Sequence, residues 1–144
     1  MHTVADQIAA AKGIWRKAPP AEVDSIAVLL AASPVELPDS YLNFLKFSNG
    51  GEGELGIQPG WFLAWPAEEV EEHNLGYQVS DQLPGLWAFG SNGGGELLAF
   101  DCRHGEPWPI LMIPFIPMCI KEAVEVASTF DEFLGQIAKP MERT

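Results

Sequence analysis

Two glycine-rich segments constrain the fold of this chain more than any other feature. In residues 37–51, Pro38 suits the first turn of a helix, Tyr41 and Phe44 follow helical spacing, and an Asn-Gly-Gly run comes where the helix must stop. In residues 89–101, apolar residues flank a Ser-Asn-Gly-Gly-Gly corner, which is typical of a tight strand-to-strand turn. The two segments therefore predict a helix that ends abruptly and a β-hairpin.

The spacing of apolar residues predicts the other elements. We expect helices over 3–17, 21–32, 39–48, 67–74 and 129–137, and strands over 55–57, 61–65, 86–89, 97–100 and 109–115, the last with pairing limited by its prolines. Trp61, Leu63 and Trp65 alternate and should share one face of their strand. Thr129 and Glu132 are spaced as a capping box for the last helix. This order of elements predicts an α+β fold in which amino-terminal helices and a carboxy-terminal helix pack on a mostly antiparallel sheet.

Size and composition favour one folded domain in the cytoplasm. The 144 residues, 47% hydrophobic and 19% charged, suffice for a core without disulfides or metals. The amino terminus has no basic start followed by an apolar run, so no secretion signal is expected. The longest apolar run, 110–120, contains two prolines and is shorter than the roughly 20 residues a membrane span needs, so no membrane contact is expected. Cys102 and Cys119 are expected to be buried thiols, although a pairing is conceivable.

The charge of the chain is acidic and unevenly distributed. The net charge is −12, and residues 47–102 contain no Lys or Arg. The acids of that stretch are Glu52, Glu54, Glu68, Glu69, Glu71, Glu72, Asp81, Glu96 and Asp101. Direct nucleic-acid binding is disfavoured, because phosphate recognition draws on clustered cations, whereas a basic protein surface would be attracted. The alternative is that the acids only keep the protein soluble.

Aromatic residues adjoin these acids and suggest a surface for a protein partner. Trp61 and Trp65 lie between two acidic segments, and aromatic anchors surrounded by charge suit an interface. The candidate partner-binding residues are Glu52, Glu54, Trp61, Trp65, Glu68, Glu69, Glu71 and Glu72. Plain core packing of both tryptophans is the competing interpretation.

The motifs that suggest catalysis or cofactor binding do not withstand inspection. Residues 51–56 match a dinucleotide fingerprint in spelling but follow a helix and carry two carboxylates where a pyrophosphate would sit. Residues 92–95 lack the lysine and hydroxyl of a phosphate loop. Cys102 and His104 fit no zinc spacing and have no evident orienting group for a thiol nucleophile. We therefore expect no catalytic residue, no metal, no cofactor and no enzymatic activity.

Taken together, the motifs of this chain resemble those of the SUKH superfamily, specifically its Smi/Knr branch, over residues 22–137. The residues that carry the resemblance are Leu37, Pro38, Tyr41, Phe44, Leu45, Asn49, Gly50, Gly51, Gly90, Gly93, Gly94, Gly95, Asp101, Pro114, Ile116, Phe130, Phe133 and Leu134. Residues 1–20 would then form a helical extension of a single domain that covers 1–144.

The resemblance implies a non-enzymatic role. Many bacterial members of the superfamily are immunity proteins that bind and neutralise a cognate polymorphic toxin, often a nuclease, and other members are regulatory interaction proteins in cell-wall signalling. The shared motifs are structural, so they transfer no catalytic residue. The prediction is an immunity protein whose acidic surface binds the basic surface of a toxin. The alternatives are a scaffold or regulator that uses the Trp61 and Trp65 region, and, more remotely, an enzyme that uses His104.

Overall fold

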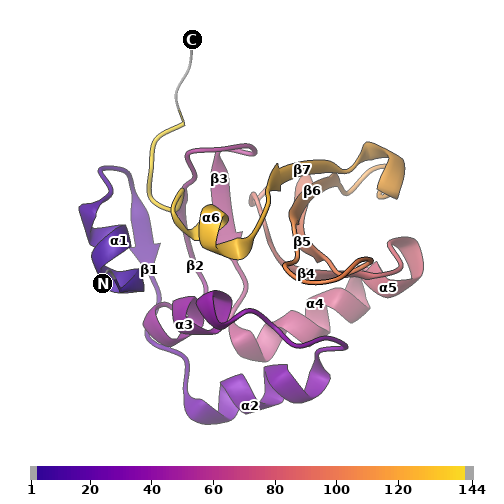
Figure 1. Ribbon diagram of the computed structural model, residues 1–144, viewed down its shortest axis with the longest axis horizontal. Coiled ribbons are helices and arrows are strands. Elements are labelled where there is room, and N and C mark those ends of the chain that lie inside the picture. The colour runs from indigo at the N-terminus through magenta and orange to yellow at the C-terminus, as the bar shows by residue number, and fades with distance from the viewer. Residues whose placement is uncertain (1–2, 142–144) are drawn as a thin grey trace.

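A computed structural model describes residues 3–141, which form six α-helices, two short 3₁₀ helices and one seven-stranded sheet (Figure 1). In chain order these are α1 (Val4–Ala10), β1 (Trp15–Lys17), α2 (Val23–Ala32), α3 (Asp39–Phe47), β2 (Gly51–Glu54), β3 (Trp61–Ala64), η1 (Ala67–Glu69), α4 (Val70–Gly76), α5 (Val79–Gln82), β4 (Leu86–Ser91), β5 (Glu96–Asp101), β6 (Ile110–Pro114), η2 (Ile120–Glu122), β7 (Val124–Ala127) and α6 (Phe130–Leu134). Residues 1–2 and 142–144, which the single-domain prediction also includes, lie outside the described residues.

The sheet has the simplest possible topology. Its strand order is β1-β2-β3-β4-β5-β6-β7, and each strand pairs antiparallel with the next one in the sequence. The predicted hairpin is confirmed: β4 and β5 pair from Leu86↔Asp101 to Ser91↔Leu97, with an irregularity between Ala88 and Gly90. Figure 1 shows β4–β7 curling away from β1–β3. The fold is therefore α+β, as predicted from the sequence.

Aromatic side chains fill the space between the sheet, α3 and α6. In Figure 1, α6 lies in front of the sheet, and α3 lies beneath it. The ring of Tyr41 on α3 is 5.3 Å from that of Phe100 on β5 and 5.3 Å from that of Phe130 on α6. Phe62 on β3 meets Phe133 on α6 edge to face at 4.9 Å. Because these rings come from separate elements, their burial joins both helices to the sheet.

The stop of α3 is built as the sequence predicts. Gly50 and Gly51 have φ values of 94° and 100°, a backbone conformation that glycine adopts without steric cost. The Ser48 hydroxyl donates to the Gly50 carbonyl (2.7 Å) and accepts from the Ala18 amide (3.1 Å), so the turn is tied to the segment before α2. The chain therefore passes from α3 straight into β2.

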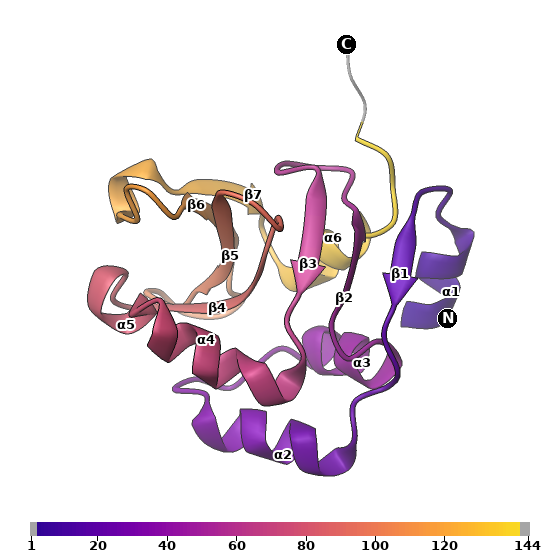
Figure 2. The ribbon, with the colours of Figure 1, turned by 180° about the vertical axis from the view of Figure 1, so that it is seen from behind.

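A second layer of helices covers the other side of the sheet (Figure 2). The helix α4 packs on β4, and α2 packs on η1 and α4, so that α2 is the outermost helix of this layer. Asn74 on α4 is buried and is hydrogen-bonded to β4: its amide nitrogen donates to the Ala88 carbonyl (2.9 Å) and its oxygen accepts from the Ala88 amide (2.9 Å). Over residues 3–141, no helix is long and apolar enough to cross a membrane.

The amino-terminal segment differs from the prediction. The helix expected over residues 3–17 ends at Ala10, and Trp15 begins a strand that pairs with β2. The Trp15 ring lies 5.9 Å from Phe62 and 5.8 Å from Phe44. The physical reason is that Trp15 buries more aromatic surface against the core from the sheet edge than a surface helix would allow.

Three other expectations are corrected. The strand expected at 55–57 lies earlier in the chain, as β2, and Leu55 forms only an isolated bridge with Ile137. The helix α6 ends at Leu134 and not at 137. The strand β6 pairs on both sides, although its prolines suggested limited pairing. The sequence did not predict α5, β7 or η2.

The predicted capping box of α6 is half formed. The Thr129 hydroxyl accepts from the Glu132 amide at 3.1 Å, as expected. The Glu132 carboxylate does not reach back to the Thr129 amide and instead accepts from the Ser128 hydroxyl at 2.6 Å. The threonine cap was thus predicted correctly, but the partner of the glutamate was not.

Candidate partner-binding surface

Four glutamates gather on the helical layer and form what we call the α4 acidic face. They are Glu68, Glu69, Glu71 and Glu72, and all four residues are exposed. Asn49 positions the start of this segment, because its side-chain oxygen accepts from the Ala67 amide (2.7 Å) and its nitrogen donates to the Glu68 carboxylate (2.9 Å). The Asn-Gly-Gly stop of α3 therefore also holds the first acid of the face.

The α4 acidic face has little internal neutralisation. Its one contact with a basic side chain within the described part of the chain joins Glu69 to Nε2 of His73 at 3.3 Å. No Lys or Arg lies within salt-bridge distance of the four carboxylates among residues 3–141. Exposed carboxylates without a Lys or Arg partner project a negative potential toward a partner, most strongly at low ionic strength.

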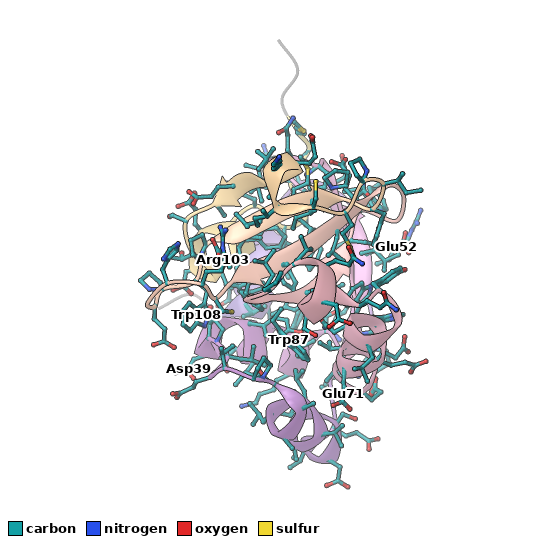
Figure 3. All side chains as sticks on the ribbon, turned by 90° about the vertical axis from the view of Figure 1, so that its right-hand side faces the viewer. Asp39, Glu52, Glu71, Trp87, Arg103 and Trp108 are labelled. Carbon is teal, nitrogen blue, oxygen red and sulfur yellow. The ribbon has the colours of Figure 1, made fainter. Side chains whose placement is uncertain are left out.

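Glu52, Glu54 and Trp61 lie on β2 and β3 and have different surroundings. Figure 3 shows Glu52 on the strands, apart from Glu71 on the helical side. Arg16 of β1 pairs with Glu52 at 3.4 Å and places its guanidinium 5.7 Å from the centre of the Trp61 ring. The Glu54 carboxylate accepts from the Ile14 amide at 2.8 Å. These acids are thus partly used within the chain, by β1 and by Ile14 just before it, in a segment predicted to be helical.

The structure corrects the expectation for Trp65. This residue follows β3, is 4% exposed, and packs against His73 (4.5 Å between ring centres) and Tyr77 (6.1 Å). It does not share an exposed face with Trp61, because Trp65 lies beyond the end of β3 and is itself buried, whereas Trp61 is half-buried. Trp65 therefore supports the inner side of α4 and is not available as an exposed anchor.

The remaining acids of residues 47–102 do not all join one surface. Asp101 is buried and receives two hydrogen bonds from the Arg103 guanidinium, at 2.8 and 2.9 Å. The Arg103 hydrogen bonds hold the pKa of the Asp101 carboxyl below its usual value, against the opposing effect of burial. Glu96 lies at the hairpin turn beside Asn92. The nine acids therefore divide into separate groups: the α4 acidic face is exposed and has no Lys or Arg partner among residues 3–141, and Asp81 on α5 is exposed as well.

The cysteine and histidine pair has the wrong electrostatics for a nucleophile. Burial and the charge of Asp101 raise the pKa of the Cys102 thiol to about 12, whereas an activated cysteine has a lowered pKa. His104 is exposed. Cys102 and Cys119 are both free and half-buried. Within residues 3–141, no three His, Cys, Asp or Glu side chains are grouped to hold a metal ion.

The structure also reveals a crevice beside the α4 acidic face that the sequence analysis missed. It has a volume of about 120 Å³. Its lining residues are Ala32, Glu71, Asn74, Leu75, Ser80 and Trp87. They come from α2, α4, β4 and the short helix α5, and only the acidity of Glu71 was a signal that sequence reasoning could use.

Comparison with known proteins identifies a family. The model of the SMI1/KNR4 family (SUKH-1) matches residues 20–136, which is most of the chain. A comparison with curated proteins gives no match.

Proposed function

Because the chain belongs to the SMI1/KNR4 family (SUKH-1), we propose that it is an immunity protein that binds a cognate toxin domain and neutralises it. Protein interaction is the general role of this family. The observation that supports our more specific proposal is the α4 acidic face, whose four exposed carboxylates meet no Lys or Arg among residues 3–141.

The proposed mechanism is electrostatic masking. A nuclease toxin needs a cationic groove to hold its nucleic-acid substrate. The α4 acidic face would occupy that groove and compete with the substrate for the same cations. Complementary charge raises the rate of association and makes it sensitive to salt, so the toxin is captured before it reaches nucleic acid.

We propose that neutralisation involves no chemical step. The raised pKa of Cys102 opposes thiolate formation, and the carboxylate of Asp101 is occupied by Arg103. These two observations weaken the enzymatic alternative that used Cys102 with His104. They support a protein that acts by binding alone.

Charge reversal tests the proposal. The variant E68K/E69K/E71K/E72K should associate with the toxin at least tenfold more slowly at low ionic strength, with a weaker dependence on salt. The matched control E106K/E122K/E125K/D131K makes the same change in net charge at other exposed acids and should associate at close to the wild-type rate. The assays are cell survival on co-expression with candidate toxins and association kinetics over a series of salt concentrations. Undiminished protection by the first variant contradicts the proposal.

A regulatory protein without a toxin partner is the second candidate. Trp61 favours it, because this half-exposed ring lies under the Arg16 guanidinium on the strand side of the molecule, away from the α4 acidic face. A Trp61→Ala variant should then lose its partners in pull-downs from cells that lack any toxin gene. Retention of all partners by this variant contradicts the regulatory alternative.

A further inference from the structure

The helix α2 has apolar side chains on both of its sides. Ile26 and Leu29 are buried and face the rest of the domain. On the opposite side, Val23, Val28 and Leu30 are 84%, 52% and 47% exposed, respectively. Figures 1 and 2 show α2 at the lower border of the molecule, with no other described element beyond it. The outer side of α2 is therefore apolar and uncovered.

This pattern differs from that of an ordinary surface helix, which turns polar residues toward the solvent. The exposed residues of α2, which we call the α2 outer face, are Val23, Asp24, Ala27, Val28, Leu30 and Ala31. Asp24 is the one polar member of this set. A helix that is apolar on all sides is normally buried on all sides, and a contiguous exposed apolar surface marks a contact with another molecule. The composition of the α2 outer face thus indicates that a further layer packs on it.

Acids border the α2 outer face along one side. The helix α2 packs on η1 and α4, the elements that carry the α4 acidic face. At the carboxy-terminal end of α2, Ala32 lines the same crevice as Glu71. Neither η1 nor α4 contains a Lys or Arg. A partner that covers the α2 outer face therefore comes close to these carboxylates and must bring cations beside its own apolar surface.

A second copy of this chain fits the α2 outer face poorly. A two-fold contact between copies of α2 would bring two α4 acidic faces toward each other, in a protein of net charge −12. The contact would also be small, because a helix of 10 residues is about 15 Å long and about 10 Å wide. Two such faces bury a few hundred Å², well below the roughly 1,200 Å² of a stable interface. Nucleic acid and anionic membranes are repelled by the same acids.

We propose that the α2 outer face packs against a helix of the protein partner, one whose apolar stripe is flanked by Lys or Arg. Ala27 and Ala31 are small and lie in the middle of the face, so the partner helix can approach closely, while Val23 and Leu30 fit between its side chains. The flanking cations pair with the α4 acidic face. The inference rests on the proposed function, since it adds to the acidic surface the apolar contact that would hold the toxin.

A titration without any toxin tests the inference on the full-length protein. The probe is the amphipathic helical peptide acetyl-KLAKLAKKLAKLAK-amide, and its control has alanine in place of each leucine, which keeps the charge and the helix propensity. We expect the leucine peptide to shift the ¹H–¹⁵N signals of Val23, Ala27 and Leu30 in a saturable manner. The alanine peptide should bind at least tenfold more weakly, a factor that the burial of one leucine side chain provides. A peptide with glutamate in place of each lysine should give no saturable shift.

Two double variants locate the contact. Val23→Gln/Leu30→Gln places two good helix formers on the α2 outer face and should weaken binding of the leucine peptide at least tenfold. The control Ile116→Gln/Val124→Gln changes two other apolar residues, which are 93% and 45% exposed, and should alter binding less than twofold. Val124 belongs to β7, which lies opposite α2 in Figure 1.

Several results would overturn the inference. They are equal binding of the leucine and alanine peptides, saturable binding of the glutamate peptide, equal effects of the two double variants, shifts confined to other residues, or no shift at millimolar peptide. Sedimentation of the wild-type protein as a dimer that Val23→Gln/Leu30→Gln dissociates would overturn it as well, because the face would then be covered by a second copy. No toxin enters these measurements, so their failure leaves the immunity proposal to its own charge-reversal test.

Discussion

Asn74 is the residue at which the junction between the helical layer and the sheet can be tested most directly. β3 pairs with β4 only through Leu63↔Ser91 and Ala64↔Gly90 within the described chain, so Ala88 has no strand partner on that side. The Asn74 side chain takes the place of the missing strand and bonds both the amide and the carbonyl of Ala88, each at 2.9 Å. Asn74→Ala should leave both of these buried backbone groups unpaired.

The size of the effect follows from those two groups. A buried polar group without a partner costs about 1–3 kcal/mol, so the loss of both should lower the free energy of unfolding by roughly 2–6 kcal/mol. The bond from Asn74 to the Val70 carbonyl is not counted, because a helical carbonyl keeps its donor four residues later. With a urea dependence of about 2 kcal/mol per molar, the unfolding midpoint should fall by roughly 1–3 M.

Urea unfolding followed by tryptophan fluorescence measures this change. The matched control is Asn43→Ala on α3, an exposed asparagine whose replacement should alter stability by no more than about 0.5 kcal/mol. If Asn74→Ala lowers the free energy of unfolding by less than about 1 kcal/mol with an unchanged urea dependence, the assigned role of this side chain is refuted.

Three further changes have defined outcomes. A Cβ at Gly90 would lie 2.6 Å from a carbonyl oxygen of β3, so Gly90→Ala should lower the free energy of unfolding in urea by about 1–3 kcal/mol. At Gly95 a Cβ would have no atom within 4 Å, so the control Gly95→Ala should lower it by less than about 0.5 kcal/mol. Thr129→Ala removes the cap of α6 and should cost about 1 kcal/mol, seen as a melting temperature a few degrees lower, while Thr129→Ser should retain stability. Arg103 lowers the pKa of Asp101 below 3.8, so the stability that this pair contributes is complete above about pH 4 and is lost as the pH falls through the folded-state pKa. The Arg103→Met variant should therefore be less stable than the wild type at pH 7 and should lose less stability between pH 7 and pH 3. An unchanged acid dependence of unfolding would argue against this pairing.

Much of the fold could be predicted because its signals are local. The helices α2 and α3 and the β4–β5 hairpin follow from short-range periodicity, from Ser33-Pro34 after α2, and from the glycines after α3 and in the hairpin turn. The strand β1 could not be predicted in this way, because the spacing of Ile8 and Trp15 is compatible with one helix, and only the distant ring of Phe62 explains why Trp15 joins the sheet. The strand β7 lies at the sheet edge with two exposed residues, Val124 and Glu125, so its pattern resembles a loop.

The candidate site was only partly predictable for a related reason. Acidity and exposure of the α4 acidic face could be inferred from composition, since unpaired carboxylates avoid the interior. The burial of Trp65 and the pairing of Glu52 with Arg16 depend on how separate elements meet, which residue types do not reveal. The crevice at Trp87 is likewise formed by α2, α4, α5 and β4 together.

The strictly sequential strand order has a consequence for how such a domain can diversify. Neighbouring strands in the sheet are also consecutive strands along the chain, so no strand must be threaded between two others during folding. Lengthening one connection adds only the slowly growing entropy of a larger loop and leaves all other pairings as they are. A lineage can therefore remodel the segment between β3 and β4, where the helices of the acidic face are inserted, while the rest of the meander keeps its architecture.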